Sequence, residues 1–551
     1  NSKTMKSYTF KLCWLLMGLC LAWGCSDDDD NVMNTGEREG SYALFLKNEL
    51  QVSGHAGTTM AVVQWSEAEW EISLGEGDLV TAVSPMSGGA ATDLHQNVRL
   101  KIDYTVNGGR EAKSQVLHLT NKTTGEVSDL TIRQGLAYET TALDIDASVR
   151  HQPVVGFGGM YNPKIWTGSN VLSTEDMNTL YGPGGLGYSV LRLMIYPNEA
   201  DWSTDVAAAR LAQENGAIVF ACPWVAPDAL TELVKVGDND VPHLKAENYA
   251  AYADHLVNYI TYMQANGVNL YAISVQNEPD MEFMTWTPEE LLTFVKQYGA
   301  KIRATGVKLM APEACGTSPD FTDPFINDAE AFAQTDIVVG HLYQGFINTA
   351  QAGYEKDRHD YVCGLYSRIG GKTWWMTEHL FNDGETETDP ALWQFRTWDY
   401  NLTHLGKEIH MCMEGYCSAY VYWYLKRFYG MLGDSDQRSP AGEGEVTKNG
   451  YILAHYAQYA TGMTRIGATS DNSSVMATAY TNEAGSEVTI VLLNLSTDTQ
   501  SVEIPLSGAT VKEAVETDAD RNMIPAETGK TDTGIYVMAN ANSIVSVRLA
   551  L

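Results

Sequence analysis

The stretch LYAISVQNE, residues 270–278, is an apolar run that ends on an asparagine and a glutamate. A second stretch, KTWWMTEH at residues 372–379, has the same character and carries Glu378 near its end. Short apolar runs bounded by polar residues, and rich in aromatic and β-branched side chains, predict strands that are buried on both faces. We therefore expect Glu278 and Glu378 to stand at the ends of two buried parallel strands.

Six further runs of this kind alternate with helical patterns: VVGFGG (154–159), SVLRLMI (189–195), AIVFACPW (217–224), KLMAPE (308–313), DIVVGHLY (336–343) and SAYVYWYL (418–425). Eight such strands separated by helices predict an α/β fold, a (β/α)8 TIM barrel, over residues 150–450. Thr287, Pro288 and Glu290 form a capping-box pattern that begins one of the helices. Because the carboxyl ends of barrel strands meet at one mouth, Glu278 and Glu378 are expected to lie there together.

A pair of carboxylates at one barrel mouth favours glycoside hydrolysis. The retaining form of this reaction needs an acid and base and a nucleophile, both carboxyl groups, about 5 to 5.5 Å apart. An isolated glutamate beside an asparagine is more often a surface polar group. Two glutamates at matched strand ends, inside a full barrel pattern, favour a polysaccharide-cleaving enzyme instead.

β-type runs flank the predicted barrel on both sides. Residues 41–136 alternate runs such as VRLKIDYTV with polar turns, which predicts a small all-β sandwich. Residues 451–551 contain VTIVLLNL, SVEIPL and IVSVRL, and together with residues 138–149 they predict a β-sandwich side domain. The expected order is therefore a β-sandwich, a barrel and a C-terminal side domain that includes a strand preceding the barrel.

The N-terminal segment predicts export. From Met5 the chain reads MKSYTFKLCWLLMGLCLAWGCSDDDD, with two lysines before an apolar stretch of about a dozen residues, too short to span a bilayer. We assign residues 1–25 to a signal peptide and residues 26–40 to an acidic linker. Cys25 resembles the lipidated cysteine of bacterial lipoproteins. The run Asp27–Asp30 resembles the surface-export tag of lipoproteins in glycan-degrading Gram-negative gut bacteria, a plain solvated linker being the alternative. These resemblances imply an outer-membrane protein facing the cell exterior, attached to the membrane through the lipid only.

Charge and cysteine usage narrow the possible partners. The formal net charge of −33 disfavours nucleic acid as a partner, because its phosphates are bound by lysine and arginine.

Outside the signal the cysteines form no disulfide framework, which predicts buried thiols: Cys222, Cys315, Cys363, Cys412 and Cys417. A pairing of Cys412 with Cys417 stays open. His341 and His379 lack a third ligand at a recognisable spacing, so we expect hydrogen-bonding roles and no metal or cofactor.

Several motifs together carry a family resemblance. They are VNLYAISVQNEPD, TWTPEELL, VKLMAPE, DIVVGHLY, WWMTEH and YVYWYLKRFYG, and they are similar to glycoside hydrolase family 30, subfamily 8, the glucuronoxylan-cleaving xylanases. The resemblance covers about Thr141 to Leu551. It implies a retaining endo-β-1,4-xylanase with Glu278 as the acid and base and Glu378 as the nucleophile. For these roles we expect a setting that raises the pKa of Glu278, and hydrogen-bond donors that keep Glu378 ionised.

The same resemblance implies a set of substrate contacts. Asn277 would donate to the sugar hydroxyl next to the reacting carbon, and Arg192 would support the nucleophile, with a purely structural ion pair as its alternative. His379 would position its neighbours through hydrogen bonds. The expected aromatic platforms for sugar rings are Trp166, Trp224, Trp286, Tyr343 and Trp423.

The requirement for a glucuronate branch stays open in the sequence. Arg427 in KRFYG resembles the arginine that binds the branch carboxylate in this subfamily. However, Leu380 and Gly384 stand roughly where the subfamily has a tyrosine and a serine that also touch the glucuronate. Cleavage of the xylan backbone is therefore a firmer expectation than dependence on the branch.

Residues 41–136 resemble the so-called BACON domain, on the basis of Trp65, Trp70, SPMSGG and the terminal TIRQG. Exposed tryptophans would make this domain a sugar-binding module. Tryptophans in its core would make it a spacer, which we favour.

Other functions were weighed against the xylanase. One is another family 30 specificity, such as an endo-β-1,6-glucanase or a glucosylceramidase, and WWMTEH and YWYLKRFYG argue against it. Another is a non-catalytic surface glycan-binding lipoprotein, and the intact pair Glu278 and Glu378 argues against that. The expected protein is a monomer whose partner is xylan with glucuronate branches.

Overall fold

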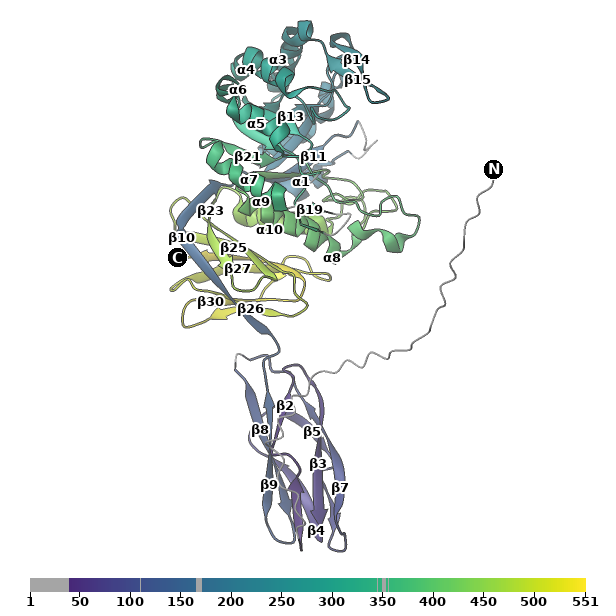
Figure 1. Ribbon diagram of the computed structural model, residues 1–551, viewed down its shortest axis with the longest axis vertical. Coiled ribbons are helices and arrows are strands. Elements are labelled where there is room, and N and C mark those ends of the chain that lie inside the picture. The colour runs from purple at the N-terminus through teal and green to yellow at the C-terminus, as the bar shows by residue number, and fades with distance from the viewer. Residues whose placement is uncertain (1–38, 110, 165–170, 344, 349–352, 355) are drawn as a thin grey trace, which may run out of the picture. The chain divides into compact units, whose positions relative to one another are not determined.

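The computed structural model describes residues 39–109, 111–164, 171–343, 345–348, 353–354 and 356–551 (Figure 1). The chain divides into two compact units, Asn1–Ala137 and Tyr138–Leu551. The predicted signal peptide, Cys25, most of the predicted linker and Trp166 lie outside the described residues. No helix in the described ranges is both long enough and apolar enough to cross a membrane.

The first unit contains two β-sheets around one core. One sheet has the order β1-β3-β7-β5 and the other β2-β9-β8-β4-β6. Their bounds are β1 Tyr42–Phe45, β2 Glu49–Val52, β3 Gly57–Ser66, β4 Ala68–Leu74, β5 Val80–Ser84, β6 Ser87–Ala90, β7 Gln96–Tyr104, β8 Lys113–Asn121 and β9 Val127–Gln134. Trp65 and Trp70 are buried in the core with their ring centroids 5.7 Å apart. Neither ring is therefore exposed as a sugar platform.

The second unit is built on a closed barrel of eight parallel strands. They are β11 Gly156–Tyr161, β12 Val190–Ile195, β13 Ile218–Pro223, β16 Ala272–Ser274, β17 Lys308–Ala314, β18 Ile337–Gly340, β21 Thr373–Met376 and β22 Cys417–Tyr422. Each lies within or overlaps one of the eight apolar runs, and β22 pairs with β11 to close the barrel. Barrel strands buried on both faces need such continuous apolar sequences.

A layer of apolar side chains fills the barrel beneath its mouth. This apolar layer includes the side chains of Val190 of β12, Ala272 of β16 and Met310 of β17. Side chains two residues apart on a strand share a face, so Arg192 and Ser274 point into the barrel one layer nearer the mouth. The sequence thus places a polar layer directly on top of the apolar one.

Helices surround the barrel, and Figure 1 shows them in teal and green. Their bounds are α1 Thr174–Tyr181, α2 Val206–Glu214, α3 Tyr249–Ala265, α4 Pro288–Arg303, α5 Pro319–Asn327, α6 Ala329–Gln334, α7 Lys356–Arg368, α8 Trp398–Asn401, α9 Lys407–Glu414 and α10 Lys448–Ala460. The expected capping box begins α4, where Thr287 Oγ1 accepts the Glu290 N–H at 3.2 Å and the Glu290 carboxylate accepts the Thr287 N–H at 2.7 Å. Two hairpins that the sequence analysis did not predict also follow barrel strands: β14 Thr231–Val236 with β15 Asn239–Leu244, and β19 Ile347–Asn348 with β20 Gly353–Tyr354.

The side domain combines one strand before the barrel with nine after it. The order of its strands is β28-β27-β31-β25-β24-β23-β10-β26-β30-β29. Their bounds are β10 Glu139–Pro153, β23 Thr464–Ser470, β24 Val475–Thr481, β25 Glu487–Asn494, β26 Gln500–Ile504, β27 Thr510–Thr517, β28 Ile524–Pro525, β29 Thr528–Lys530, β30 Ile535–Ala539 and β31 Ser543–Ala550. β10 pairs antiparallel with β23 and parallel with β26, so the segment before the barrel belongs to this domain.

Candidate active site

Glu278 and Glu378 lie together at the mouth of the barrel. Glu278 follows β16 and Glu378 follows β21, and both side chains are buried. One carboxylate oxygen of each glutamate and one ring nitrogen of His341 all lie within 4.8 Å of one another. This separation agrees with the short spacing of a retaining pair and falls below the roughly 6.5 Å minimum of an inverting pair.

Two donors hold the carboxylate of Glu378. Arg192 Nη1 donates to Oε2, and the hydroxyl of Tyr343 donates to Oε1 at 2.8 Å. Arg192 is fully buried, and its guanidinium carbon lies 4.9 Å from the ring centroid of Trp224. Its Nη2 also donates to Asn277 Oδ1 at 2.6 Å. Arg192 therefore fixes the orientation of Glu378 and Asn277 at the same time.

His341 bridges two carboxylates. Its Nδ1 lies 2.9 Å from Glu278 Oε1, and its Nε2 lies 3.3 Å from Glu313 Oε1. Carboxylates accept hydrogen bonds, so both ring nitrogens act as donors and the ring is an imidazolium. Burial alone would lower the pKa of His341, but the charge of Glu378 and the hydrogen bonds to Glu278 and Glu313 outweigh it and raise the pKa to about 9.

A histidine nitrogen and two carboxylates this close could also ligate a metal ion. The guanidinium of Arg192 lies against Glu378, however, and would repel a second cation. Both nitrogens of a bridging imidazolium carry protons, so His341 has no lone pair for a metal. The arrangement suits proton transfer better than metal binding.

The pKa of Glu378 differs from the sequence expectation. Burial raises it, and the charge of Glu278 adds to this, while the charges of His341 and Arg192 act in the opposite direction. The expected donors are present, but they do not outweigh the cost of burying the charge. Glu378 nevertheless accepts two hydrogen bonds, from Arg192 and Tyr343, while Glu278 pairs with His341. Both oxygens of Glu378 are therefore held by donors, as a nucleophilic carboxylate requires.

Glu313 is a third buried carboxylate that the sequence analysis did not single out. It lies on β17 and is fully buried, and Ser274 Oγ donates to its Oε2. Burial would raise the pKa of Glu313, but the hydrogen bond from His341 and the charge of Arg192 lower it below its ordinary value. A signal was present in the sequence, because KLMAPE also ends an apolar run on a glutamate.

The backbone at Glu278 and Glu313 is strained. Their φ angles are 46° and 65°, in the left-handed region that residues with a side chain rarely adopt. The N–H of Glu278 donates to the carbonyl of Glu313 at 2.9 Å, so the two strained segments support each other. Such conformations persist where the surrounding structure fixes them, often in active sites.

The glutamate pair opens into a cavity of about 410 Å³. It is lined by Trp224, Glu278, Met281, Phe283, Cys315, Tyr343, Glu378, Trp423, Arg427 and Tyr429. The ring centroids of Trp224 and Trp423 are 5.6 Å apart, which provides an aromatic wall. Asn277 is fully buried and is not among the described residues that line the cavity, and its Nδ2 has no hydrogen-bond partner within the described part of the chain. Its expected contact with the sugar stays a prediction.

Two expected contacts lie elsewhere. Trp286 is not among the described residues that line the cavity; its ring stacks on Tyr249 with centroids 5.7 Å apart and packs edge-on against Phe294. Trp286 thus packs among aromatic rings in this structure, and its role as a sugar platform stays a prediction. His379 lies behind the cavity, where its Nδ1 is 2.7 Å from Glu408 Oε1 and its ring centroid is 5.1 Å from that of Tyr343. It can position Tyr343 but is not among the residues that form the cavity wall in the described ranges.

Arg427 reaches the catalytic cavity from the segment after β22. Its guanidinium carbon lies 5.3 Å from the ring centroid of Tyr429 and 5.5 Å from that of Phe428. The neighbouring cation Lys426 is engaged elsewhere, because its Nζ pairs with Asp176 Oδ2 at 2.9 Å. Of these two cations, Arg427 is the one that can meet a ligand in the cavity.

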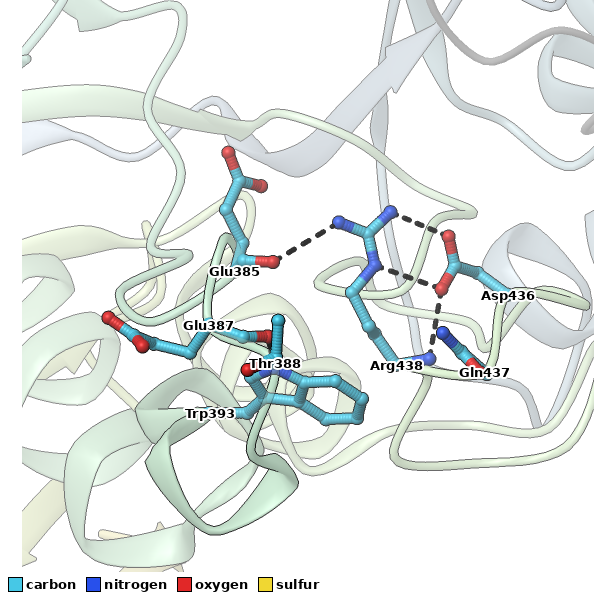
Figure 2. A pocket seen from close by; sticks show the side chains of 7 residues that line it. All are labelled: Glu385, Glu387, Thr388, Trp393, Asp436, Gln437 and Arg438. Atoms are coloured by element: carbon cyan, nitrogen blue, oxygen red, sulfur yellow. Dashed lines mark hydrogen bonds and ion pairs between the residues drawn. The ribbon is translucent and has the colours of Figure 1, made fainter.

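Figure 2 shows a second cavity, of about 680 Å³. It is lined by Glu385, Glu387, Thr388, Trp393, Asp436, Gln437 and Arg438. Arg438 lies 3.7 Å from the centroid of Phe428 and donates to Asp436 from Nε at 2.9 Å and Nη2 at 2.6 Å. Gly384 begins this segment with a φ of +85°, and a Cβ there would lie 2.1 Å from the carbonyl oxygen of Leu392. A serine at this position would require the loop to move.

No family model matches the chain. It is 36% identical over 361 residues to Glucuronoxylanase XynC of Bacillus subtilis strain 168. The aligned region covers 64% of this chain and 78% of that protein. It is 32% identical over 412 residues to a second Bacillus subtilis Glucuronoxylanase XynC, which covers 73% of this chain and 90% of the relative. Among solved structures, a GH30 endoxylanase from Clostridium papyrosolvens C71 superposes with a TM-score of 0.62 at 31% identity, covering 75% of this chain and all of that one.

Proposed function

Because the chain belongs to glycoside hydrolase family 30, we propose that it is a retaining endo-β-1,4-xylanase that acts on glucuronoxylan. The observation that carries the proposal is the close pair of buried glutamates, with oxygens of Glu278 and Glu378 within 4.8 Å of each other. The names of the two Bacillus relatives support xylan as the substrate.

The geometry supports double displacement. Glu378 attacks the anomeric carbon while Glu278 gives its proton to the glycosidic oxygen, so that the glycosidic bond breaks as an ester bond to Glu378 forms. Glu278, now ionised, then takes a proton from a water molecule, whose oxygen displaces Glu378 and restores the starting configuration. Arg192 and Tyr343 keep the nucleophile in place and receive it again as a carboxylate.

Trp224, Trp423 and Asn277 would hold the sugar. The rings of Trp224 and Trp423 offer apolar faces beside the reacting glutamates, on which pyranose C–H groups stack. The unpaired Nδ2 of Asn277 would donate to the hydroxyl next to the anomeric carbon, where hydrogen bonds strengthen in the transition state. Binding energy would thus be concentrated near the bond that breaks.

Arg427 would bind the carboxylate of a glucuronate branch. A guanidinium is suited to a carboxylate because it can donate two parallel hydrogen bonds. Gly384 itself has no side-chain hydroxyl, so Arg427 would supply most of the branch recognition. We therefore expect the branch to improve cleavage without being indispensable for it.

A product profile tests this proposal. The protein lacking residues 1–25 is incubated with glucuronoxylan, with arabinoxylan poor in glucuronate, and with β-1,6-glucan as the control. We expect internal cleavage of both xylans, faster on glucuronoxylan, and none of the glucan. Cleavage of the glucan alone, or of no polysaccharide, would remove the proposed activity.

We also propose that the protein acts at the outer face of the outer membrane, attached through a lipid on Cys25. The support is the sequence before residue 39 alone: an apolar export signal, Cys25 after Gly24, and the run of aspartates that follows. Such a location would let a large polysaccharide reach the cavity before import of its fragments.

A further inference from the structure

Glu313 lies outside the cavity wall yet joins both cations of the site. Its Oε1 accepts from Arg192 Nη2 at 3.1 Å and from His341 Nε2 at 3.3 Å, and its Oε2 accepts from Ser274. It is not among the described residues that line the cavity, so it is not expected to touch the sugar. Arg192 and His341 in turn contact Glu378 and Glu278.

The buried charges of this cluster balance only with one proton on the glutamates. Arg192 and imidazolium His341 contribute two positive charges, and Glu278, Glu313 and Glu378 offer three carboxylates. An uncompensated charge in a buried site is strongly unfavourable, so one carboxylate should carry a proton. Glu313 accepts from two cations and a hydroxyl, which makes it the carboxylate least able to hold that proton.

Removing the charge of Glu313 would change this balance. Without it, a neutral His341 restores charge neutrality while Glu278 keeps its proton and Glu378 stays ionised. Glu278 would then lose its cationic partner, because a neutral ring can form the hydrogen bond to its carboxyl group but carries no charge. The carboxylate that Glu278 becomes when it gives up its proton would be less stable without that charge, so Glu278 would be a weaker acid.

We propose that Glu313 is a positioning residue that keeps His341 cationic and Arg192 in place, so that an imidazolium faces the carboxyl group of Glu278 when that group gives up its proton. This inference rests on the proposed retaining mechanism. It extends that mechanism from the two reacting glutamates to a third carboxylate that acts only through His341 and Arg192.

The groups around Glu313 come from several strands. Those that are charged or titratable are Arg192 of β12, Cys222 of β13, His341 after β18, and the glutamates Glu278 and Glu378. Burial raises the pKa of the Cys222 thiol well above its ordinary value, which keeps it neutral. Arg192 and His341 are therefore the two cations through which Glu313 acts in this cluster.

The test is the protonation of His341 in Glu313→Gln, a variant that keeps the side-chain shape and removes the charge. In the parent, NMR of ¹⁵N-labelled histidine should place the titration midpoint of the His341 ring near its raised pKa of about 9. Loss of a buried anion in contact with the ring should lower this midpoint by about one unit or more. We expect kcat to fall by about tenfold to a hundredfold with KM changed less than about threefold, because the lost function is proton transfer and not sugar binding.

The pH dependence of stability gives a second readout. The raised pKa of His341 stabilises the fold fully below its unfolded value of 6.5, and this contribution disappears as the pH rises to about 9. In Glu313→Gln the lowered pKa should reduce the loss of stability over that interval. If Glu313 served only to support the structure, its substitution would lower the stability of the protein without changing how that stability depends on pH.

Glu408→Gln is the matched control. Glu408 is also fully buried and also pairs with a histidine, His379, at 2.7 Å. Its substitution should leave the midpoint of His341 unchanged. An unchanged midpoint in Glu313→Gln, or an equal shift in Glu408→Gln, would overturn the inference.

A measurement on the parent protein decides the matter if Glu313→Gln does not fold. At pH 7.5 both ring nitrogens of His341 should be protonated, which NMR detects directly, and a neutral ring would overturn the inference. The NMR readout needs no substrate. If the parent cleaves no xylan while His341 titrates as expected in parent and variant, the proposed activity fails and the assignment of Glu313 to the protonation of His341 stands.

Discussion

At the scale of single residues, we propose that Arg427 decides whether the enzyme prefers xylan that carries glucuronate branches. Its guanidinium lies beside the rings of Tyr429 and Phe428 and lines the cavity. Asp436 and Arg438 form an ion pair of their own, and Arg438 lies 3.7 Å from the ring centroid of Phe428. The chain therefore offers two arginines on neighbouring surfaces, of which only Arg427 lines the cavity beside the glutamates.

Arg427→Ala should lower kcat/KM on glucuronoxylan by about tenfold to a hundredfold, because a charged hydrogen bond contributes about 1.5 to 3 kcal/mol. On xylan poor in glucuronate the change should stay within about twofold. Initial rates on the two substrates give the comparison, with Arg438→Ala as the control. Equal losses on both substrates in Arg427→Ala would remove its role in branch recognition.

At the scale of elements, the barrel strands were predictable because each needs a continuous apolar run. The inward orientation of the Glu313 side chain was not predictable in this way. Successive side chains of a regular strand point alternately into and out of the barrel. Met310 packs inside the barrel, so Glu313, three residues later, would be expected to point outward. A register shift between Pro312 and Ala314 reverses this and points the carboxylate at Arg192. Alternation cannot reveal such an irregularity in a single sequence.

The packing of Trp286, in contrast, follows from a local sequence motif. It directly precedes Thr287, the N-cap of α4, a position whose apolar side chain commonly packs back on the first turns of the helix. Its contacts with Phe294 and Tyr249 follow this pattern. The helix-start motif thus accounts for the tryptophan in TWTPEELL without any sugar.

The cap of α4 can be tested by Thr287→Ala. Loss of the hydroxyl that accepts the Glu290 N–H should lower the free energy of unfolding by about 1 kcal/mol. Thermal unfolding of the parent, of Thr287→Ala and of Thr287→Ser measures the effect. The serine variant keeps the hydroxyl and should resemble the parent; an equal loss in both variants would argue against the capping interaction.

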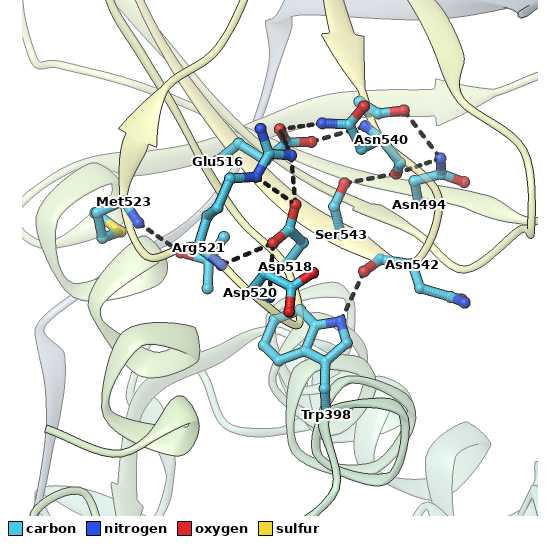
Figure 3. Close-up of polar contacts among 12 residues, drawn as sticks. Trp398, Asn494, Glu516, Asp518, Asp520, Arg521, Met523, Asn540, Asn542 and Ser543 are labelled. Carbon is cyan, nitrogen blue, oxygen red and sulfur yellow. Dashed lines mark hydrogen bonds and ion pairs between the residues drawn. The ribbon is translucent and has the colours of Figure 1, made fainter.

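At the scale of the whole molecule, the second unit joins its barrel to the side domain by polar contacts. Figure 3 shows Trp398 of α8, whose Nε1 donates to the carbonyl of Asn542 at 2.7 Å. Lys448 of α10 donates from Nζ to the carbonyl of Asp518 at 2.6 Å. β10 also runs from the side domain to the start of the barrel. The side domain is thus a fixed part of the unit that contains the barrel.

The proposed membrane attachment belongs to the same scale. In cells given radioactive palmitate, the parent should become labelled and sediment with the membrane fraction, because a lipid on Cys25 would hold it there. Cys25→Ala should lose the label and appear in the soluble fraction. A labelled Cys25→Ala protein would show that the lipid, if present, is elsewhere.

The central claim is that Glu278 and Glu378 act as a retaining pair. Proton NMR of a xylo-oligosaccharide digest, recorded in the first minutes of reaction, reports the configuration of each newly formed reducing end before it equilibrates. We predict that the β-anomer forms first and the α-anomer follows only by spontaneous mutarotation. Initial release of the α-anomer would contradict the assignment of Glu378 as the nucleophile and of Glu278 as its acid and base.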